Sequence, residues 1–343
     1  MCEHVATNEL ARIPLVEFRT DCIQLSTVVT HDADRDEFDA ASIFDEFAVV
    51  EIAGHANSLA CLPSVAPTCH CLDMTFSIVA RSSDGTQYGV AVASKFLAVG
   101  SAVPAAAANV GAVATQANAN LSYRPDGLLL LAAGRSPAAA IRELTSADDD
   151  RHQRQLGVVG ISGHGASFTG ADCHAWAGGR TGEGYAIQGN ILVDESVVAA
   201  METAWLTSDP TAALARRLYA ALLAGDAAGG DRRGRQSAAL FVVSPGGGYG
   251  GGSDVLIDLR VDDHPAPCIE LARLLELHEL YFGATVESHP LEGDLAVEVQ
   301  SLLERLGYPT LESWLGVENF EERAVAGGID VLVLAKLREA GAL

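Results

Sequence analysis

The sequence predicts an α+β fold organised around a layered β-sheet. Two strand patterns, at 75–81 and 88–99, are joined by a Ser-Asp-Gly turn signal at 83–85 that supplies the positive φ a hairpin needs. The run at 88–99 is apolar with many small residues, which is typical of a strand buried on both faces. Further strand patterns follow, interspersed with helical patterns. We therefore expect 75–99 to form the central hairpin of the sheet.

Two polar residues, Ser94 and Lys95, interrupt the apolar run of the second strand. A charged side chain inside such a strand is costly unless it is partnered or used in chemistry. Lys95 is one of only two lysines in the chain, so its placement is informative. The alternative is a lysine at the end of the strand whose amine reaches solvent.

The composition excludes several classes of partner. The net charge is −23, with 45 acidic against 22 basic residues, so the chain lacks the basic surface that nucleic acids or anionic membranes require. Arginine replaces lysine almost throughout, and the acidic excess is spread along the chain, a pattern that favours a salt-adapted (halophilic) protein. The apolar run at 99–114 is interrupted by Pro104 and Asn109, and the start has no signal-peptide pattern, so we expect a cytoplasmic protein.

Residues 1–73 differ from the rest of the chain. They contain a single glycine, Gly54, and five of the seven cysteines. Three explanations are open: a regulatory extension, a propeptide, or an upstream stretch included by a wrong start codon, which we favour because Met74 begins the recognisable domain. The triplet Cys69-His70-Cys71 has no second ligand pair at usable spacing, so no metal site is expected.

Another strand pattern, at 111–120, ends in polar residues at alternate positions. Gln116, Asn118 and Asn120 would project from one face of an extended segment. Clustered side-chain amides at a strand end can hold a substrate carbonyl or amide. The alternative is a network that only satisfies loop backbone groups.

The middle of the chain adds strands, helices and a polar loop. The short strand at 185–190 places Gln188 and Asn190 on one face. Polar residues are dense in the loop at 229–237, directly before a strand at 238–244; its candidate binding residues are Asp231, Arg233 and Gln236. An exposed basic turn is the alternative. Other strands are expected at 155–161, 166–169 and 255–261, and helices at 136–145, 192–205, 211–224 and 267–281.

The last strand is followed by Asp262, Asp263 and His264. Two adjacent carboxylates beside a histidine suit acid–base chemistry or cation binding. Equally, Asp263 would serve as the cap of the next helix. From residue 291 onward, three short helical patterns indicate a separate interaction module.

Six motifs occur in order and resemble the domain of unknown function 1028 family: MTFSIVA, SKFLAVG, ATQANAN, WAG…GxGYxxQGN, GGDRRGRQSAAL and DLRVDDHPAP. The resemblance covers about 74–283 and implies a four-layer αββα sandwich like that of the N-terminal nucleophile (Ntn) hydrolases. The tail at 291–343, with GYPTLESWLGVENFEER, resembles a small helical peptidoglycan-binding module. The expected organisation is an extension at 1–73, an Ntn-hydrolase-like domain at 74–285 and the module at 291–343.

The resemblance implies amide hydrolysis of a small molecule or peptide. Removal of the preceding residues would expose Thr75, whose hydroxyl is the nucleophile and whose free α-amine, with a pKa near 8, is the base. Lys95 would lower the nucleophile's pKa or stabilise an oxyanion, with Ser94 beside it. Neutral donors would come from Gln116, Asn118 or Asn190. No cofactor is expected.

Two other functions are compatible with the sequence. One is a non-catalytic binding or scaffold protein that keeps the layered fold and uses the module at 291–343 for recognition. The other is catalysis at Asp262, Asp263 and His264 with a divalent metal. The many Ala and Gly residues are compatible with a homo-oligomer, but nothing in the sequence demands one.

Overall fold

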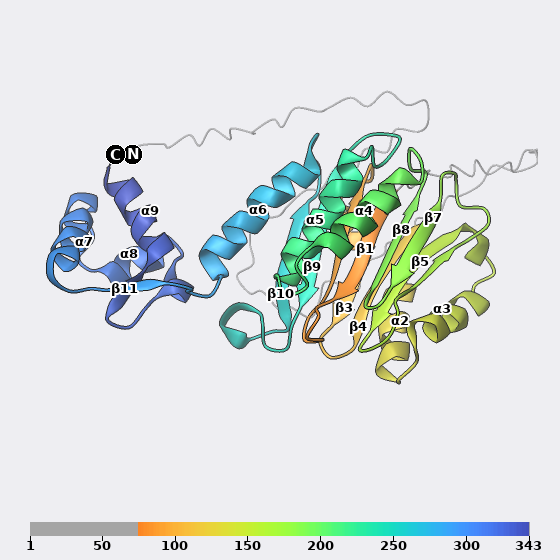
Figure 1. The fold of residues 1–343 in the computed structure, drawn as a ribbon, viewed down its shortest axis with the longest axis horizontal. Helices are drawn as coiled ribbons and strands as arrows, with labels where there is room; N and C mark the ends of the chain where they lie inside the picture. Colours follow the sequence, from red (N-terminus) through yellow and green to blue (C-terminus); the bar gives the residue numbers. More distant parts are fainter. Residues whose placement is uncertain (1–74, 343) are drawn as a thin grey trace, which may run out of the picture. The chain divides into compact units, whose positions relative to one another are not determined.

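The computed structural model describes residues 75–342 and has a mixed α+β architecture with antiparallel sheets, as expected (Figure 1). The larger sheet has the order β10-β9-β2-β1-β8-β7 and the smaller one β3-β4-β5-β6. The strands of the larger sheet are β1 (Thr75–Arg81), β2 (Tyr88–Ser94), β7 (Gly178–Gly182), β8 (Tyr185–Asn190), β9 (Ser237–Val243) and β10 (Val255–Val261). Those of the smaller sheet are β3 (Pro104–Ala107), β4 (Gly111–Ala117), β5 (Arg154–Gly160) and β6 (Ala166–Thr169).

Helices cover the outer faces of the two sheets, which pack against each other through β1, β2, β4 and β5. In Figure 1, α4 and α5 run along the larger sheet, and α2 and α3 lie by the smaller one. The helices of this part are α1 (Val99–Ala102), α2 (Tyr123–Ala132), α3 (Pro137–Ser146), α4 (Ser196–Thr207), α5 (Leu214–Ala227) and α6 (Pro267–Phe282). Two short 3-10 turns, η1 (Arg151–Gln153) and η2 (Tyr249–Gly251), complete it.

The central strand β1 separates two cores because its side chains alternate between the faces of the sheet. Phe76 and Ile78 pack in the core under α4 and α5. Val79 packs in a second core that contains residues of β4 and β5. Thr75 and Ser77, which have the same parity as Val79, therefore face the second sheet rather than the helices.

The predicted hairpin is confirmed, but its second strand is shorter than expected. β2 ends at Ser94 instead of residue 99, and the chain then turns into the short helix α1. Ala98, which precedes α1, has a left-handed backbone conformation with φ 54°. The pairing of β2 with both of its neighbours ends at Ser94, so Lys95 lies outside the strand.

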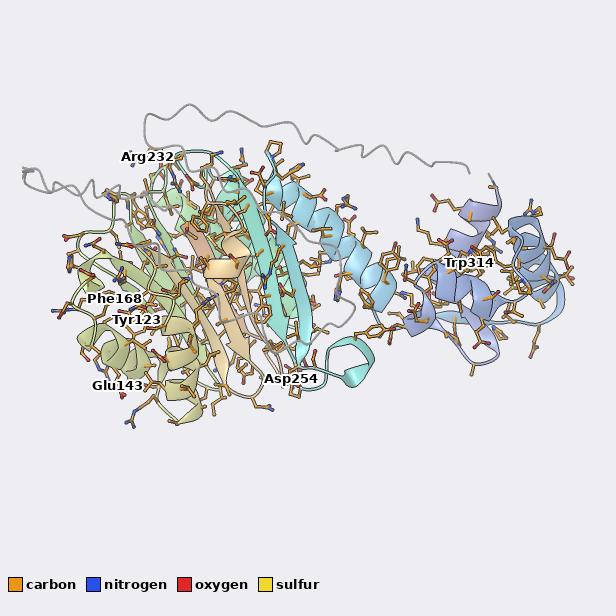
Figure 2. All side chains as sticks on the ribbon, turned by 180° about the vertical axis from the view of Figure 1, so that it is seen from behind. Tyr123, Glu143, Phe168, Arg232, Asp254 and Trp314 are labelled. Carbon is orange, nitrogen blue, oxygen red and sulfur yellow. The ribbon has the colours of Figure 1, made fainter. Side chains whose placement is uncertain are left out.

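The C-terminal segment has a core of its own, which includes Trp314 (Figure 2). Its elements are β11 (Ser288–Pro290), α7 (Gly293–Leu306), α8 (Leu311–Val317), η3 (Glu321–Arg323), β12 (Gly328–Asp330) and α9 (Val331–Gly341). Arg323 and Asp330 form a buried ion pair at 2.9 Å in this segment. None of the helices in the described range is long and apolar enough to cross a membrane.

Helix α6 takes part in two cores. Leu271 and Leu275, nearer its start, are buried in the core of the larger sheet. Leu280 and Tyr281, near its end, pack with the C-terminal core. The guanidinium of Arg323 also donates hydrogen bonds to the backbone carbonyls of Glu279 and Leu280. The last turn of α6 is thus tied to the C-terminal segment.

Candidate functional site

A row of four polar residues crosses the larger sheet at the first position of β1. The strand register pairs Thr75 with Ser94 on one side and with Asn190 on the other. Ser94 pairs in turn with Ser237 on β9. All four side chains are buried. The fold therefore gathers three hydroxyls and one amide at one end of the central strands, where an apolar row would be the usual composition of a buried sheet.

Thr75 is held closely in this row. Its hydroxyl oxygen lies 3.2 Å from that of Ser94, and its side chain is almost fully buried. Its backbone carbonyl accepts hydrogen bonds from Gln116 Nε2 at 3.1 Å and from Asn190 Nδ2 at 3.4 Å. The main chain and the hydroxyl of Thr75 are therefore both fixed by polar neighbours.

A buried amide network, consisting of Ser77, Gln116, Gln155, Gln188 and Asn190, surrounds this end of β1 and links the two sheets. Gln116 Nε2 donates to Gln155 Oε1 at 2.8 Å, and Asn190 Nδ2 donates to the same oxygen at 3.0 Å. Gln188 Nε2 donates to the Ser77 hydroxyl at 2.6 Å, and that hydroxyl donates to Gln116 Oε1. Gln155 also donates to the backbone carbonyl of Gly189 at 2.8 Å. Every member is uncharged, so the network costs far less to bury than ionised groups would.

Two acceptor oxygens of the network, Gln188 Oε1 and Asn190 Oδ1, have no hydrogen-bond partner among residues 75–342. Gln188 Oε1 packs against Gly157 of β5: a Cβ placed on Gly157 would stand 2.0 Å from this oxygen, so the amide occupies the space that only glycine leaves. Asn190 Oδ1 is a buried acceptor on the residue paired with Thr75, and a buried acceptor without a donor is destabilising.

The predicted residues of the 229–237 loop reach the same end of the sheet. The carboxylate of Asp231 is buried and accepts a hydrogen bond from the backbone N–H of Lys95 at 2.7 Å. It also accepts the backbone N–H of Arg233 at 2.8 Å, with the Arg233 guanidinium at 3.3 Å. The backbone N–H of Gln236 donates to the Ser94 carbonyl at 3.1 Å. The interpretation of this loop as a purely exposed basic turn is therefore wrong for Asp231.

Lys95 itself does not project into the sheet. Its side chain is exposed, and Nζ donates to the backbone carbonyl of Arg235 at 3.3 Å. This placement matches the alternative of a lysine at the end of the strand that reaches solvent. The expectation that Lys95 interrupts the strand is wrong because β2 ends one residue earlier.

Asp263 and His264 lie outside the buried part of the site, and both are exposed. The backbone N–H of His264 donates to the Gln236 carbonyl at 2.7 Å, which joins this segment to the loop. The expected cap by Asp263 is wrong: α6 begins after Ala266, whose N–H donates to His264 Nδ1 at 3.0 Å. Over residues 75–342, no group of three His, Cys, Asp or Glu side chains is placed to hold a metal ion.

Asn118 and Asn120 do not share a face with Gln116, contrary to expectation. β4 ends at Ala117, whose φ of 66° turns the chain and breaks the alternation of an extended strand. Asn118 is exposed and donates to Gln153 Oε1 at 2.8 Å. Asn120 donates to Asp148 Oδ2 at 3.1 Å. Both amides take part in a second polar cluster, which lies next to the end of β4 in the smaller sheet.

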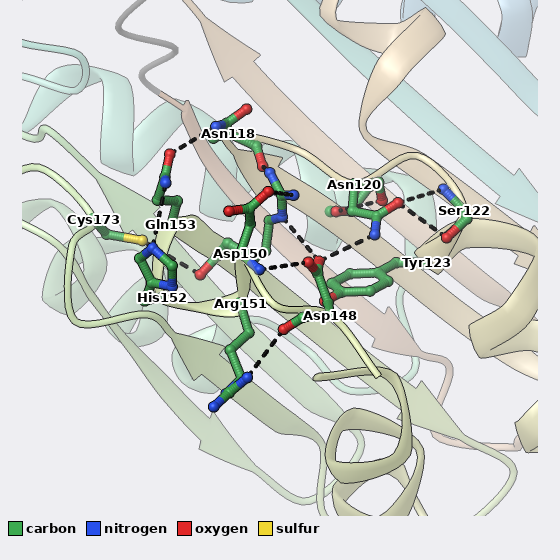
Figure 3. Close-up of polar contacts among 12 residues, drawn as sticks. Asn118, Asn120, Ser122, Tyr123, Asp148, Asp150, Arg151, His152, Gln153 and Cys173 are labelled. Carbon is green, nitrogen blue, oxygen red and sulfur yellow. Dashed lines mark hydrogen bonds and ion pairs between the residues drawn. The ribbon is translucent and has the colours of Figure 1, made fainter. Parts of the chain in front are cut away.

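That cluster is centred on Asp148 (Figure 3). Asp148 Oδ2 accepts hydrogen bonds from the Tyr123 hydroxyl at 2.7 Å and from Arg154 Nε at 3.0 Å. Burial by itself raises the pKa of Asp148, but the hydrogen bonds from Arg154, Tyr123 and Asn120 lower it to well below the ordinary value. Burial and the neighbouring carboxylate raise the pKa of Tyr123. Asp148 is therefore an ionised anchor that joins α2, the turn after α3, and β5.

Three residues that the sequence analysis did not single out complete the buried site: Ser77, Gln155 and Ser237. Each is a polar residue at or near the start of an apolar strand pattern, which is the signal that would have found them. Ser77 and Ser237 belong to the larger sheet and Gln155 to the smaller one. Which strands lie opposite one another is set by contacts distant in sequence, so the sequence pattern does not show that these side chains meet.

The comparisons with known proteins confirm the resemblance. A family model described as "Family of unknown function (DUF1028)" matches residues 75–271, and one described as "Putative peptidoglycan binding domain" matches 284–337. A crystal structure of a protein from Silicibacter pomeroyi, assigned to the same family of unknown function, superposes with a TM-score of 0.54 at 32% identity. The alignment covers 66% of this chain and 93% of that one. No curated protein matches the chain.

Proposed function

We propose that this chain, which belongs to the family of unknown function DUF1028, is an amidohydrolase of the Ntn type that cleaves a small amide or peptide with Thr75 as its N-terminal nucleophile. The observation that carries the proposal is the setting of Thr75 at the head of the central strand, with its hydroxyl buried beside Ser94 and its carbonyl held by two amides. The proposal includes the interpretation of the two sheets and their covering helices as the four-layer αββα sandwich of that class.

The chemistry needs a base, and the described side chains that bond to Thr75 do not provide one. Ser94, Gln116 and Asn190 carry hydroxyl and amide groups, which do not accept a proton at neutral pH. A free α-amine on Thr75, with an ordinary pKa of about 8, would be a competent base in the same position. The neutral surroundings therefore favour a mechanism in which nucleophile and base belong to one residue.

The reaction would proceed through an ester on Thr75. The α-amine takes the hydroxyl proton as Oγ1 attacks the substrate carbonyl, and the resulting ammonium gives that proton to the leaving nitrogen as the C–N bond breaks. A water molecule, deprotonated by the same amine, then hydrolyses the ester and restores the hydroxyl. Asn190 Oδ1, a buried acceptor without a donor within residues 75–342, is suited to accept a hydrogen bond from the ammonium formed in each half of the cycle.

The auxiliary residues follow from the contacts. Gln116 and Asn190 Nδ2 hold the Thr75 carbonyl, which fixes the direction of β1 at the reacting residue. Ser94 supplies a hydroxyl within hydrogen-bonding distance of the nucleophile. Asp231 organises the backbone of Lys95 and Arg233 at the same end of the sheet, where the proposal places the substrate.

The test begins with the N-terminal sequence and intact mass of protein that has been purified from its native host. Protein that begins at Thr75 is then treated with an electrophilic β-lactone. The expected result is one acyl group on Thr75, retained in Thr75→Ser and absent in Thr75→Ala. Native protein in which Thr75 remains in a peptide bond would contradict the mechanism, and so would equal labelling of the Thr75→Ala variant. Either result would favour a binding protein that keeps this fold.

A further inference from the structure

A pocket lies at the far end of β1, away from Thr75. It has a volume of about 500 Å³, and its lining includes Arg81, Ser83, Trp205, Leu206, Ser208 and Arg217. Thr75 and Arg81 are the first and last residues of the seven-residue strand, so about 20 Å of extended chain separates them. The pocket is thus independent of the proposed catalytic site. A volume of this size suits a small organic ligand.

The chemical character of the pocket is set by Arg217. Its side chain is only 8% exposed, and its guanidinium carbon lies 3.8 Å from the centre of the Trp205 ring. Nε donates to the Ser208 hydroxyl at 2.9 Å and Nη2 to the Trp205 carbonyl at 3.3 Å. Nη1 has no hydrogen-bond acceptor among the described residues, and no carboxylate in the described part of the chain pairs with this arginine.

A buried guanidinium without a counter-ion is unusual because each buried charge costs several kcal/mol unless it is paired. Burial lowers the pKa of Arg217, and only the longer-range charge of Asp209 opposes this effect. The other arginine of the pocket, Arg81, is paired with Glu183 and contacts the carbonyls of Gly160 and Gly163. Among the described residues, the positive charge of this pocket without a carboxylate partner is therefore that of Arg217, in a chain whose net charge is −23.

We propose that this pocket binds a small organic oxyanion, a carboxylate or a phosphate ester, with Arg217 Nη1 as the donor that recognises it. Trp205 holds the guanidinium plane from one side, and Ser208 and the Trp205 carbonyl fix its in-plane orientation. The remaining edge of the planar fork matches the geometry of a carboxylate or phosphate. The ligand's body would occupy the space between Leu206 and the Ser83 turn.

The test measures binding of inorganic phosphate, and separately of acetate, to the full chain by calorimetry at constant ionic strength. The first comparison uses Arg217→Met, which removes the charge, and Arg216→Met as the matched control. Arg216 is the preceding residue of α5, but it pairs with Glu279 and does not line the pocket. We expect saturable binding of at least one anion by the wild type and the control, and a loss of at least tenfold in Arg217→Met.

A second pair of variants keeps the test decisive if Arg217→Met fails to fold. Leu206 lines the pocket and is 62% exposed, so polar replacements there leave the core intact. Leu206→Glu introduces a repelling carboxylate, and Leu206→Gln has nearly the same shape without the charge. Weaker binding in the glutamate variant alone supports the site. Equal binding by both, or no saturable binding of either anion by the wild type, would overturn it.

Discussion

The hydroxyl oxygens of Thr75 and Ser94 lie 3.2 Å apart, on paired residues of the two central strands. Both side chains are buried, so bulk water does not compete for this contact. Either hydroxyl can be the donor. The pair therefore places a second hydroxyl against the oxygen that we propose to attack the substrate.

Replacing Ser94 by alanine should slow the acylation of Thr75. A hydrogen bond of this kind contributes about 1 kcal/mol, so the loss should be on the order of fivefold to tenfold in the rate constant. The measurement is the rate of β-lactone labelling followed by mass spectrometry. Ser101→Ala is the control, because Ser101 is exposed, lies outside the row of Thr75, and uses its hydroxyl to bond to the Ala98 carbonyl. Equal rates for both variants would remove Ser94 from the mechanism.

Replacing Gln116 by leucine should destabilise the fold. Its amide bonds to the Thr75 carbonyl, to Gln155 and to Ser77, so these buried groups would lose partners together. Each unsatisfied buried group costs about 1–3 kcal/mol, and we expect a loss of about 3 kcal/mol in the free energy of unfolding. Urea denaturation measures it. Asn118→Leu, an exposed amide on the same segment, should change stability by less than about 0.5 kcal/mol.

Adding one methyl group at Gly157 should also destabilise the protein. The new Cβ would stand 2.0 Å from Gln188 Oε1, so the amide would have to leave its position between the sheets. Overpacking of this kind typically costs about 1–3 kcal/mol. Gly316→Ala is the control because, among the described residues, nothing beyond its chain neighbours and the backbone of its own helix lies within 4 Å of its Cβ position. A thermal midpoint of Gly157→Ala equal to that of the wild type would contradict the close contact.

The stabilisation from Asp148 should depend on pH. Its pKa is lower in the folded protein than the value of about 3.9 expected when unfolded, so its contribution is complete above the unfolded value. That contribution is lost as the pH falls through the lower, folded value. The difference in unfolding free energy between the wild type and Asp148→Asn should therefore be largest near neutral pH and shrink below pH of about 4.

The measurement is chemical denaturation from pH 7 down to the acid limit of stability. Asp149→Asn, at the exposed neighbouring carboxylate, serves as the control and should follow the wild-type curve. If the unfolding free energies of the wild type and Asp148→Asn differ by the same amount at every pH, the negative charge of Asp148 does not stabilise the folded protein.

The sequence is a good guide wherever a pattern is local. The alternation of strand residues correctly predicts that Gln188 and Asn190 share a face, because both lie within the regular strand β8. The same rule fails for Asn118, because Ala117 adopts a positive φ. Alanine rarely has this conformation, so the sequence gives no signal for it. Where β2 ends is also decided at a distance, since Asp231 binds the backbone of Lys95 across 136 residues of sequence.

Local sequence patterns also cannot predict the buried amide network, because its members come from strands that are distant in sequence. Gln155 begins a predicted strand, but its role depends on β5 packing opposite β1 and β8. Such packing follows from the whole topology of the two sheets. Sequence periodicity can mark these polar residues as unusual, but only the fold shows that they meet.

Because α6 packs in two hydrophobic cores, it should couple the unfolding of one core to that of the other. Leu275 belongs to one core and Tyr281 to the other, on a single continuous helix. Melting the C-terminal segment would uncover the last turns of this helix, and fraying of those turns would in turn loosen the larger core. We therefore expect Trp205 and Trp314, one in each core, to report the same cooperative transition rather than two separate ones.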